Sequence, residues 1–301
     1  MAFVWPIGGR KGGSGKSFLT SSLGRLSAKA GKKTLIIDLD LGAANLHTLV
    51  GVPYPEKGFS DFLQKRILLL EDTVIQTSFE NLFLISGARD NFDIANLPYA
   101  QKMKTLRAIA KLDYDRILLD LGAGTSFNTL DFFLISQNGI FITTPEPTSI
   151  ENVYRLIRSI YFRLIRYCFT APEFRVLSEE IEKKFGQGAS NRPDTMMNAL
   201  AALYPDRYEK LQDELASFRF KLVINQMRRY DNVSLGPQIS RMVEKHLGLQ
   251  LEFAGNVTYD DHVHDAICQQ TSFVDRYPYT RTALDLKELS RQIVEHAGRQ
   301  L

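Results

Sequence analysis

The chain has 301 residues, 44% of them hydrophobic, and its 37 basic and 34 acidic side chains leave a formal charge of only +3. So apolar a composition excludes an intrinsically disordered chain, and so small an excess of positive charge excludes a polycation that binds nucleic acid by charge alone. The two cysteines, Cys168 and Cys268, lack CxxC spacing, which excludes a disulfide framework and a thiolate metal site and predicts two small buried side chains in a reducing compartment.

Short apolar runs alternate with segments of helical periodicity along the chain. The runs are residues 2–7, 33–40, 81–87, 115–122, 138–145, 220–226 and 250–257. They show no polar alternation, so each strand is expected to be covered on both faces. The pattern predicts an α/β fold, a doubly wound and mostly parallel sheet flanked by helices, which collects ligands at the carboxyl ends of its strands.

The first strand leads into GGRKGGSGKS, residues 8–17, and a helical segment follows. In such a loop the backbone N–H groups wrap phosphates, a lysine reaches the β- and γ-phosphates, and the next serine ligates Mg²⁺. A strict GxxxxGK[ST] motif has glycine where this chain has Arg10. The alternative is a glycine-rich turn with an incidental lysine. The residues that we expect to bind nucleotide here are Gly12, Gly13, Ser14, Gly15, Lys16, Ser17 and Phe18.

Carboxylates follow two of the predicted strands. Asp38 and Asp40 end the strand at 33–40, where α/β sheets gather ligand groups. Asp40 is alternatively a cap for a helix that starts near Ala43. Asp120 has the features of a Walker B aspartate, because an apolar strand precedes it and glycines that let a loop move with the γ-phosphate follow it.

The connection between the strands at 138–145 and 220–226 is too long for one helix. About 70 residues lie there, whereas a helical crossover needs only about a dozen. We predict helices over 149–169 and 173–185 and two more around 194–216, with a loop at 186–194. Residues 149–218 are therefore a helical insertion within the fold.

A stripe of arginines, Arg155, Arg158, Arg163 and Arg166, follows the first helix of this insertion. A basic amphipathic helix can meet a membrane surface, DNA phosphate or an acidic partner. The other interpretation is a solvated face over a packed core. Near the end of the chain, Leu286, Leu289, Ile293 and Ala297 form an apolar stripe that is expected to pack against the sheet.

At KGGSGKS, residues 11–17, the chain resembles the deviant Walker A box of the MinD/ParA group of P-loop ATPases, whose signature is the additional lysine. The resemblance continues through residues 35–51, 117–134, 222–226 and 259–278, and the sequences of these motifs are most similar to those of the FleN/FlhG branch. It implies a single P-loop ATPase domain over residues 1–301, with ATP and Mg²⁺ as cofactors.

The resemblance also implies roles for individual residues. Lys11 crosses an ATP-dependent homodimer to the phosphates held by the partner subunit, and Asp40 orients the attacking water. The implied catalytic residues are Lys11, Lys16 and Asp40, and the implied metal site is Ser17, Asp38 and Asp120. Asn225 is placed against the adenine, with Thr258, Tyr259 and Asp260 on its other side, although many relatives have proline where this chain has Thr258.

The resemblance implies an ATP-driven switch that positions or regulates a cellular assembly, such as a flagellum or another polar structure, and hydrolyses ATP slowly until a partner stimulates it. The partner is a protein that binds through residues 149–218, a DNA or a membrane surface. The start of the chain carries no leader pattern, so we expect a cytoplasmic protein recruited to a membrane, a pole or the nucleoid. Two alternatives stay open, a metabolic enzyme similar to cobyrinate or dethiobiotin synthetase and a weakly hydrolysing nucleotide-binding scaffold.

Overall fold

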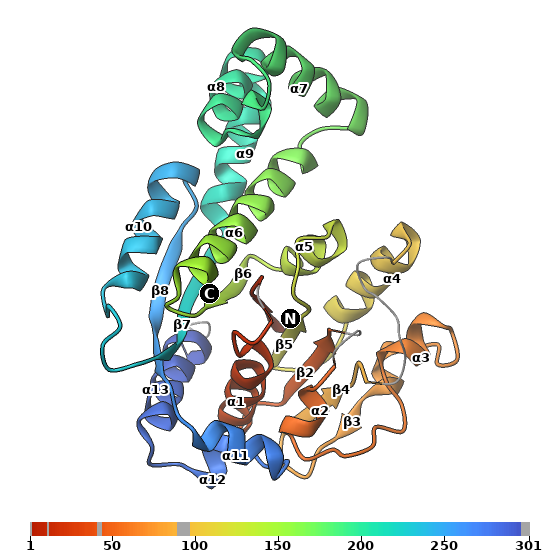
Figure 1. The fold of residues 1–301 in the computed structure, drawn as a ribbon. Helices are drawn as coiled ribbons and strands as arrows, with labels where there is room; N and C mark the ends of the chain where they lie inside the picture. The colour runs from red at the N-terminus through yellow and green to blue at the C-terminus, as the bar shows by residue number, and fades with distance from the viewer. Residues whose placement is uncertain (1, 11, 41–43, 89–96, 296–301) are drawn as a thin grey trace.

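The computed structural model describes residues 2–10, 12–40, 44–88 and 97–295 of the chain. In this part of the chain one sheet has the strand order β3-β4-β2-β5-β1-β6-β7-β8 (Figure 1). The strands are β1 Phe3–Gly8, β2 Thr34–Leu39, β3 Ile75–Gln76, β4 Leu82–Ile85, β5 Arg116–Leu121, β6 Asn138–Thr143, β7 Arg219–Met227 and β8 Leu251–Thr258. All neighbours pair in parallel except β3 and β4. The predicted doubly wound, mostly parallel sheet is confirmed.

Helices cover both faces of the sheet. The longer ones are α1 Lys16–Lys29, α4 Tyr99–Ala110, α6 Pro147–Tyr167, α7 Ala171–Phe185, α8 Pro193–Leu203, α9 Pro205–Ser217, α10 Leu235–Leu247 and α13 Arg281–Ser290. The shorter ones are α2 Leu46–Leu49, α3 Phe59–Leu63, α5 Phe127–Phe133, α11 His262–Cys268 and α12 Phe273–Arg276, with single 3₁₀ turns at Leu70–Thr73 and Ala189–Asn191 and a π turn at Arg291–Glu295.

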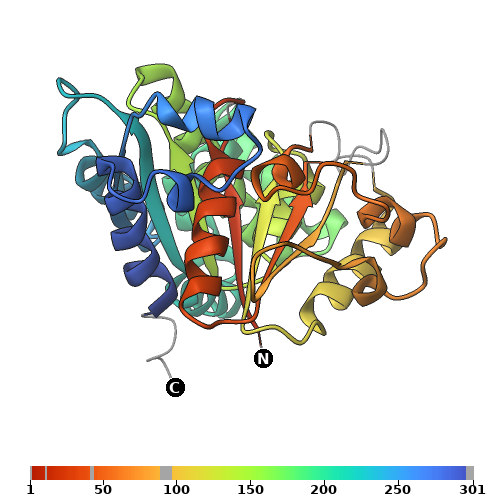
Figure 2. The same cartoon turned by 90° about the horizontal axis from the view of Figure 1, so that it is seen from below.

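The central strands divide their side chains between two cores. In β2, Leu35 and Ile37 belong to one core and Ile36 to the other. The helices α1 and α13 cover the core that contains Ile36, while α4, α5, α6 and α10 cover the opposite face (Figure 2). Because both faces are buried, most positions of these strands are apolar on either side, which is why the sequence runs show no alternation.

Four helices, α6 to α9, connect β6 to β7, which lie next to each other in parallel. Their bounds agree with the predicted helices to within about two residues, the usual uncertainty of a helix end. The apolar side of α6 is buried along its length, and α7 and α8 lie beyond the sheet at the far end of α6 (Figure 1). The crossover therefore extends the molecule on the face opposite α1.

The final apolar stripe packs as expected where it is described. Leu286, Leu289 and Ile293 are buried in the core beneath α1 and α13, whereas Ala297 lies outside the described residues. The prediction of two buried cysteines was wrong: Cys168 is only partly buried, and Cys268 is exposed because only Ala266 of the short helix α11 is buried. Within the described residues no helix is both long enough and apolar enough to cross a membrane.

Candidate functional site

The loop between β1 and α1 depends on glycine at two positions. Gly13 has φ +82° and Gly15 has φ +88°, a left-handed backbone that other residues rarely adopt. A Cβ on Gly15 would also lie 2.2 Å from Nδ2 of Asn225. These glycines therefore let the loop turn sharply and approach the end of β7.

The N-terminus of α1 opens directly from this loop. Its first hydrogen bond within the helix joins the Leu19 N–H to the Gly15 carbonyl, so the N–H groups of Lys16, Ser17 and Phe18 have no partner within the helix. The first turn carries no acidic residue, and the Lys16 side chain is buried. The positive end of the helix dipole and a buried ammonium group thus act at one point, which favours a bound anion.

Two side chains at the end of β7 hold the carbonyl groups of the loop. Asn225 Nδ2 donates to the Ser14 carbonyl at 2.9 Å, and Gln226 Nε2 donates to the Gly13 carbonyl at 2.9 Å. Gln226 has φ +61°, an uncommon conformation for a residue with a side chain. With its carbonyl oxygens bonded to β7, the loop keeps its N–H groups for an anionic ligand.

Two buried carboxylates lie beside the start of α1. Asp38 on β2 is in register with Asp120 on β5, and both side chains are almost fully buried. Asp120 Oδ1 accepts a hydrogen bond of 3.4 Å from the Thr20 hydroxyl, whereas Oδ2 has no hydrogen-bond partner among the described residues.

Burial and neighbouring carboxylates raise the pKa of both carboxyl groups. Burial raises the pKa of Asp120 to about 6, although the Ser17 hydroxyl and the Lys16 ammonium act in the opposite direction. Burial and the negative charge of Asp120 raise the pKa of Asp38 well above its usual value. A cation next to these oxygens would remove the cost of their ionised forms.

The residues present fit Mg²⁺ only if a phosphate shares it. Among the described side chains, no group of three or more His, Cys, Asp or Glu residues could hold a metal on its own. Mg²⁺ typically keeps several waters and binds one or two protein groups together with phosphate oxygens. The Ser17 hydroxyl and the unpartnered oxygen of Asp120 match that donor set.

Asp40 lies just beyond the end of β2. Its N–H donates to Asp38 Oδ1 at 3.1 Å, and its own carboxylate would lie 3.1 Å from a Cβ added to Gly122, in the loop after β5. Asp38, not Asp40, accepts the hydrogen bond from the start of α2, because the N–H of Leu46, its first residue, donates to Asp38 Oδ2 at 3.1 Å. Asp40 therefore keeps its carboxylate at the cavity.

The opposite wall comes from the end of β8. The Thr258 N–H and hydroxyl both donate to Asp285 Oδ2 on α13, at 2.9 and 2.6 Å. A proline here would have neither donor, so this departure from the family pattern creates a tie between the loop and α13. Next to it, the Arg228 guanidinium lies 4.6 Å from the ring centre of Tyr259.

All these elements border one cavity of about 640 Å³ at the carboxyl ends of the strands. Of the residues expected to bind nucleotide, the cavity is lined by Gly12, Gly13, Gly15, Lys16, Ser17, Phe18, Asn225, Thr258, Tyr259 and Asp260. Ser14, Asp38 and Asp120 lie buried around it, Asp40 lines it, and Lys11 lies outside the described residues. Sequence reasoning missed Gln226, the α2 residues Thr48 and Leu49, and the α11 residues Val263 and Ile267.

A family model described as the CobQ/CobB/MinD/ParA nucleotide binding domain matches residues 6–273. The antiactivator FleN of Pseudomonas aeruginosa is 21% identical over 292 residues, which are 96% of this chain and 85% of that protein. The solved structure of the septum site-determining protein MinD of Pyrococcus horikoshii, complexed with Mg-ADP, is 20% identical with a TM-score of 0.66 and covers 99% of this chain and 98% of its own. In the MinC:MinD complex of Aquifex aeolicus, a matching chain is 19% identical with a TM-score of 0.63, covering 98% of this chain and 96% of that one.

Proposed function

This chain belongs to the CobQ/CobB/MinD/ParA nucleotide-binding family, and we propose that it is an ATP-driven switch that dimerises on ATP and hydrolyses it slowly. One observation carries the proposal. The N-terminus of α1, which favours an anion, lines the cavity of about 640 Å³ with Lys16 and Ser17, and the buried Asp38–Asp120 pair, which favours a cation, lies next to these two residues. Mg²⁺ together with a triphosphate satisfies both ends at once.

ATP binding rests on the loop and the two strand ends. The N–H groups at the start of α1 and the Lys16 ammonium bind the phosphates, and the Ser17 hydroxyl and Asp120 hold Mg²⁺. Asn225 and the loop of Thr258, Tyr259 and Asp260 face the base. The Mg-ADP bound to the Pyrococcus horikoshii relative supports this assignment.

Hydrolysis needs a positioned water and stabilisation of the charge on the transferred phosphoryl group. Asp40 lies at the cavity without a buried cation partner among the described residues, so its carboxylate can accept a hydrogen bond from the attacking water. When bound, Mg²⁺ neutralises charge on the phosphate oxygens. Asp38 supports the magnesium site by accepting hydrogen bonds from the backbone N–H groups of Asp40 and Leu46.

Lys11 couples hydrolysis to dimerisation in this proposal. A cation supplied across the dimer stabilises the charge of the transition state, as an arginine finger does. The support is the sequence KGGSGKS and the family match. Such an enzyme acts as a timer, because a bound partner or surface sets the rate at which the dimer resets.

The cellular role that we propose is the positioning or regulation of an assembly by an ATP-dependent homodimer bound to a protein partner. The match to the FleN antiactivator over 96% of this chain favours a flagellar or other polar structure. The MinC:MinD complex of a relative supports a protein partner over DNA or lipid.

The direct test measures ATP binding and oligomeric state. Lys16→Ala should abolish binding of a fluorescent ATP analogue, while Lys32→Ala, an exposed lysine on the loop after α1, should leave it unchanged. With non-hydrolysable ATP and Mg²⁺, light scattering should show a dimer. A chain that binds ATP but stays monomeric would be a nucleotide-binding scaffold, and product formation from a carboxylate substrate would make it a synthetase.

A further inference from the structure

A second cavity, of about 510 Å³, lies between α5, α6 and α7. Its wall carries five arginines, Arg10, Arg155, Arg158, Arg163 and Arg166, and no aspartate or glutamate. We call it the arginine cavity. The charged side chains of its wall are therefore all basic, and it shares no lining residue with the cavity at the ends of β7 and β8.

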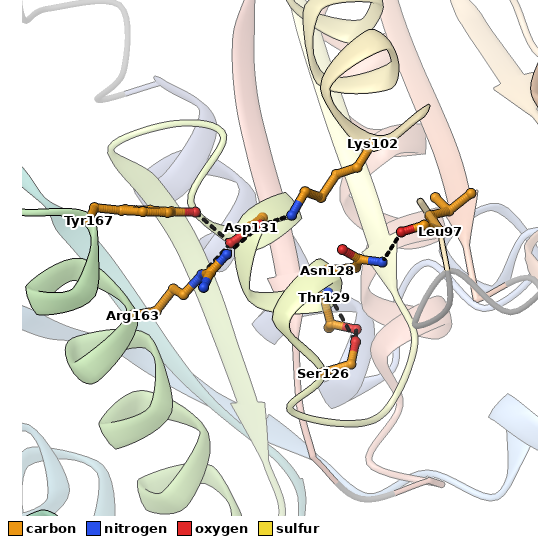
Figure 3. A network of polar contacts seen from close by, with 8 residues as sticks. All are labelled: Leu97, Lys102, Ser126, Asn128, Thr129, Asp131, Arg163 and Tyr167. Atoms are coloured by element: carbon orange, nitrogen blue, oxygen red, sulfur yellow. Dashed lines mark hydrogen bonds and ion pairs between the residues drawn. The ribbon is translucent and has the colours of Figure 1, made fainter. Parts of the chain in front are cut away.

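Only some of these arginines are neutralised. Arg163 forms a two-point ion pair with the buried Asp131, which also bonds Lys102 and Tyr167 (Figure 3), and Arg155 pairs with Glu151 one helical turn away. Among the described residues, Arg10, Arg158 and Arg166 have no carboxylate partner; Arg158 donates only to the Asn191 carbonyl.

Aromatic rings contact two of the three unpaired guanidinium groups, those of Arg158 and Arg166. Arg166 lies 5.2 Å from the ring centre of Phe127 and 5.5 Å from that of Phe174, and Arg158 lies 5.6 Å from that of Phe162. A guanidinium group over a ring keeps its in-plane N–H donors for another acceptor. Since these cations already rest on aromatic rings, an anion can bind them with a smaller loss of side-chain entropy than free arginines would need.

We propose that the arginine cavity binds an acidic segment of a protein partner, with glutamate or aspartate side chains on Arg158 and Arg166. The pair between Arg163 and Asp131 shows how this helix takes a carboxylate, through Nε–Oδ1 at 2.6 Å and Nη2–Oδ2 at 2.8 Å. From Arg155 to Arg166 the helix rises about 16 Å, the length of a short peptide segment. Phe127, 57% exposed, adds an apolar contact that a partner side chain can cover.

Shape and chemistry favour a peptide over duplex DNA. A duplex is a rigid convex cylinder that needs a long open basic surface, whereas these arginines line a hollow that a narrow chain can enter. Mixed apolar and cationic walls suit a segment that carries both carboxylates and an apolar side chain.

The arginine cavity is also bordered by residues of the loops next to the nucleotide site. Arg10 precedes the phosphate loop, and Thr125 lies in the segment between Asp120 and α5. This inference rests on the proposed function, because it names the place where the partner of that switch binds. ATP is therefore expected to change the affinity of the cavity for the acidic segment.

The test measures fluorescence anisotropy of a labelled peptide that contains glutamates and one phenylalanine. The whole chain should bind it. Arg158→Gln with Arg166→Gln should weaken binding by about tenfold or more, since one hydrogen bond to a charged group typically contributes about tenfold to affinity. Arg175→Gln is the matched control, because this arginine is exposed on α7 and outside the cavity. A peptide with lysine in place of glutamate should not bind.

Hydrogen exchange on the unaltered chain keeps the test independent of variant folding. The acidic peptide should protect the segment from Arg155 to Arg166, and protection elsewhere alone would overturn the proposal. Equal binding by all variants, or binding of a short duplex or anionic vesicles but not the peptide, would also overturn it. ATP binding is measured on the same samples, so failure of the unaltered chain to bind the peptide while it still binds ATP rejects this inference and leaves the proposed function standing.

Discussion

Asp38 and Asp120 face each other in register on β2 and β5, and both carboxylates are buried without a cation bonded to them among the described residues. Burial raises the pKa of Asp120 from 3.8 to about 6. A carboxyl group with a raised pKa binds its proton more tightly in the folded state than in the unfolded state. Its contribution is therefore complete at low pH and is lost as the pH rises from about 4 to about 6, which is about 3 kcal/mol for one group.

Asp120→Asn removes the cost of a buried carboxylate and its repulsion of Asp38. It also removes a proposed metal ligand. Without nucleotide, the free energy of unfolding at neutral pH should rise by roughly 2 kcal/mol, and its decrease between about pH 4 and 6 should flatten. ATP hydrolysis should be lost. Denaturant unfolding across this pH range measures the first effect, with the exposed Asp113→Asn as control. An unchanged pH profile would mean that Asp120 does not titrate in this range.

Mg²⁺ with a non-hydrolysable ATP analogue should reverse the pH dependence. The bound cation stabilises the ionised carboxylates, so the melting temperature should increase more above about pH 6 than below it. The melting temperature is measured across this pH range with the analogue and Mg²⁺, and again with the analogue and a chelator that removes Mg²⁺. If the increase is the same at every pH, the cation does not act on Asp38 and Asp120.

The sequence predicts the strands and the phosphate loop because both depend on local patterns. Residues such as Leu35, Ile36 and Ile37 are apolar without exception because the sheet is buried on both faces. The partners of polar side chains were beyond reach, since Asp131 and Arg163 are 32 positions apart and nothing local pairs them. The two-residue strand β3 and the left-handed Gln226 also leave no periodic or compositional signal.

Gln226→Gly should weaken ATP binding by about two- to tenfold. Glycine adopts φ +61° readily, but it cannot form the hydrogen bond from the Gln226 side chain to the Gly13 carbonyl, which contributes about 0.5–1.5 kcal/mol. Titration with a fluorescent ATP analogue measures the affinity. Gln270→Gly is the matched control, because Gln270 is also left-handed, with φ +51°, and lies outside the cavity. An equal effect of both changes would point to general flexibility instead.

Thr258→Val should reduce both stability and ATP affinity, and Thr258→Pro should do so further. Valine removes the hydroxyl donor to Asp285, and proline also removes the N–H donor, at about 1 kcal/mol for each bond. Thr271→Val provides a contrast, because the buried Thr271 hydroxyl has no partner in the described structure and its loss should be neutral or stabilising. Thermal melting with and without the nucleotide analogue separates the two effects.

Asp131 joins three helices through side chains that are distant in the sequence. It lies on α5, its ion-pair partners Lys102 and Arg163 lie on α4 and α6, and Tyr167 donates to it from the last turn of α6 (Figure 3). Burial alone would raise the pKa of Asp131, but the hydrogen bonds from these partners outweigh it and hold the pKa below its ordinary value. The stability that this carboxylate contributes is therefore present at neutral pH and lost as the pH falls through its lowered pKa.

Asp131→Asn should lower the free energy of unfolding by about 3–5 kcal/mol, because it leaves the buried Lys102 ammonium without its counter-charge. The loss should be largest at neutral pH and should shrink in acid, where the native carboxylate is protonated as well. Asp213→Asn, on the exposed side of α9, should change stability by less than about 0.5 kcal/mol. Denaturant titration of both variants at neutral and acidic pH measures the difference. A loss of equal size at both pH values would show that packing of the side chain, not its charge, holds α4, α5 and α6 together.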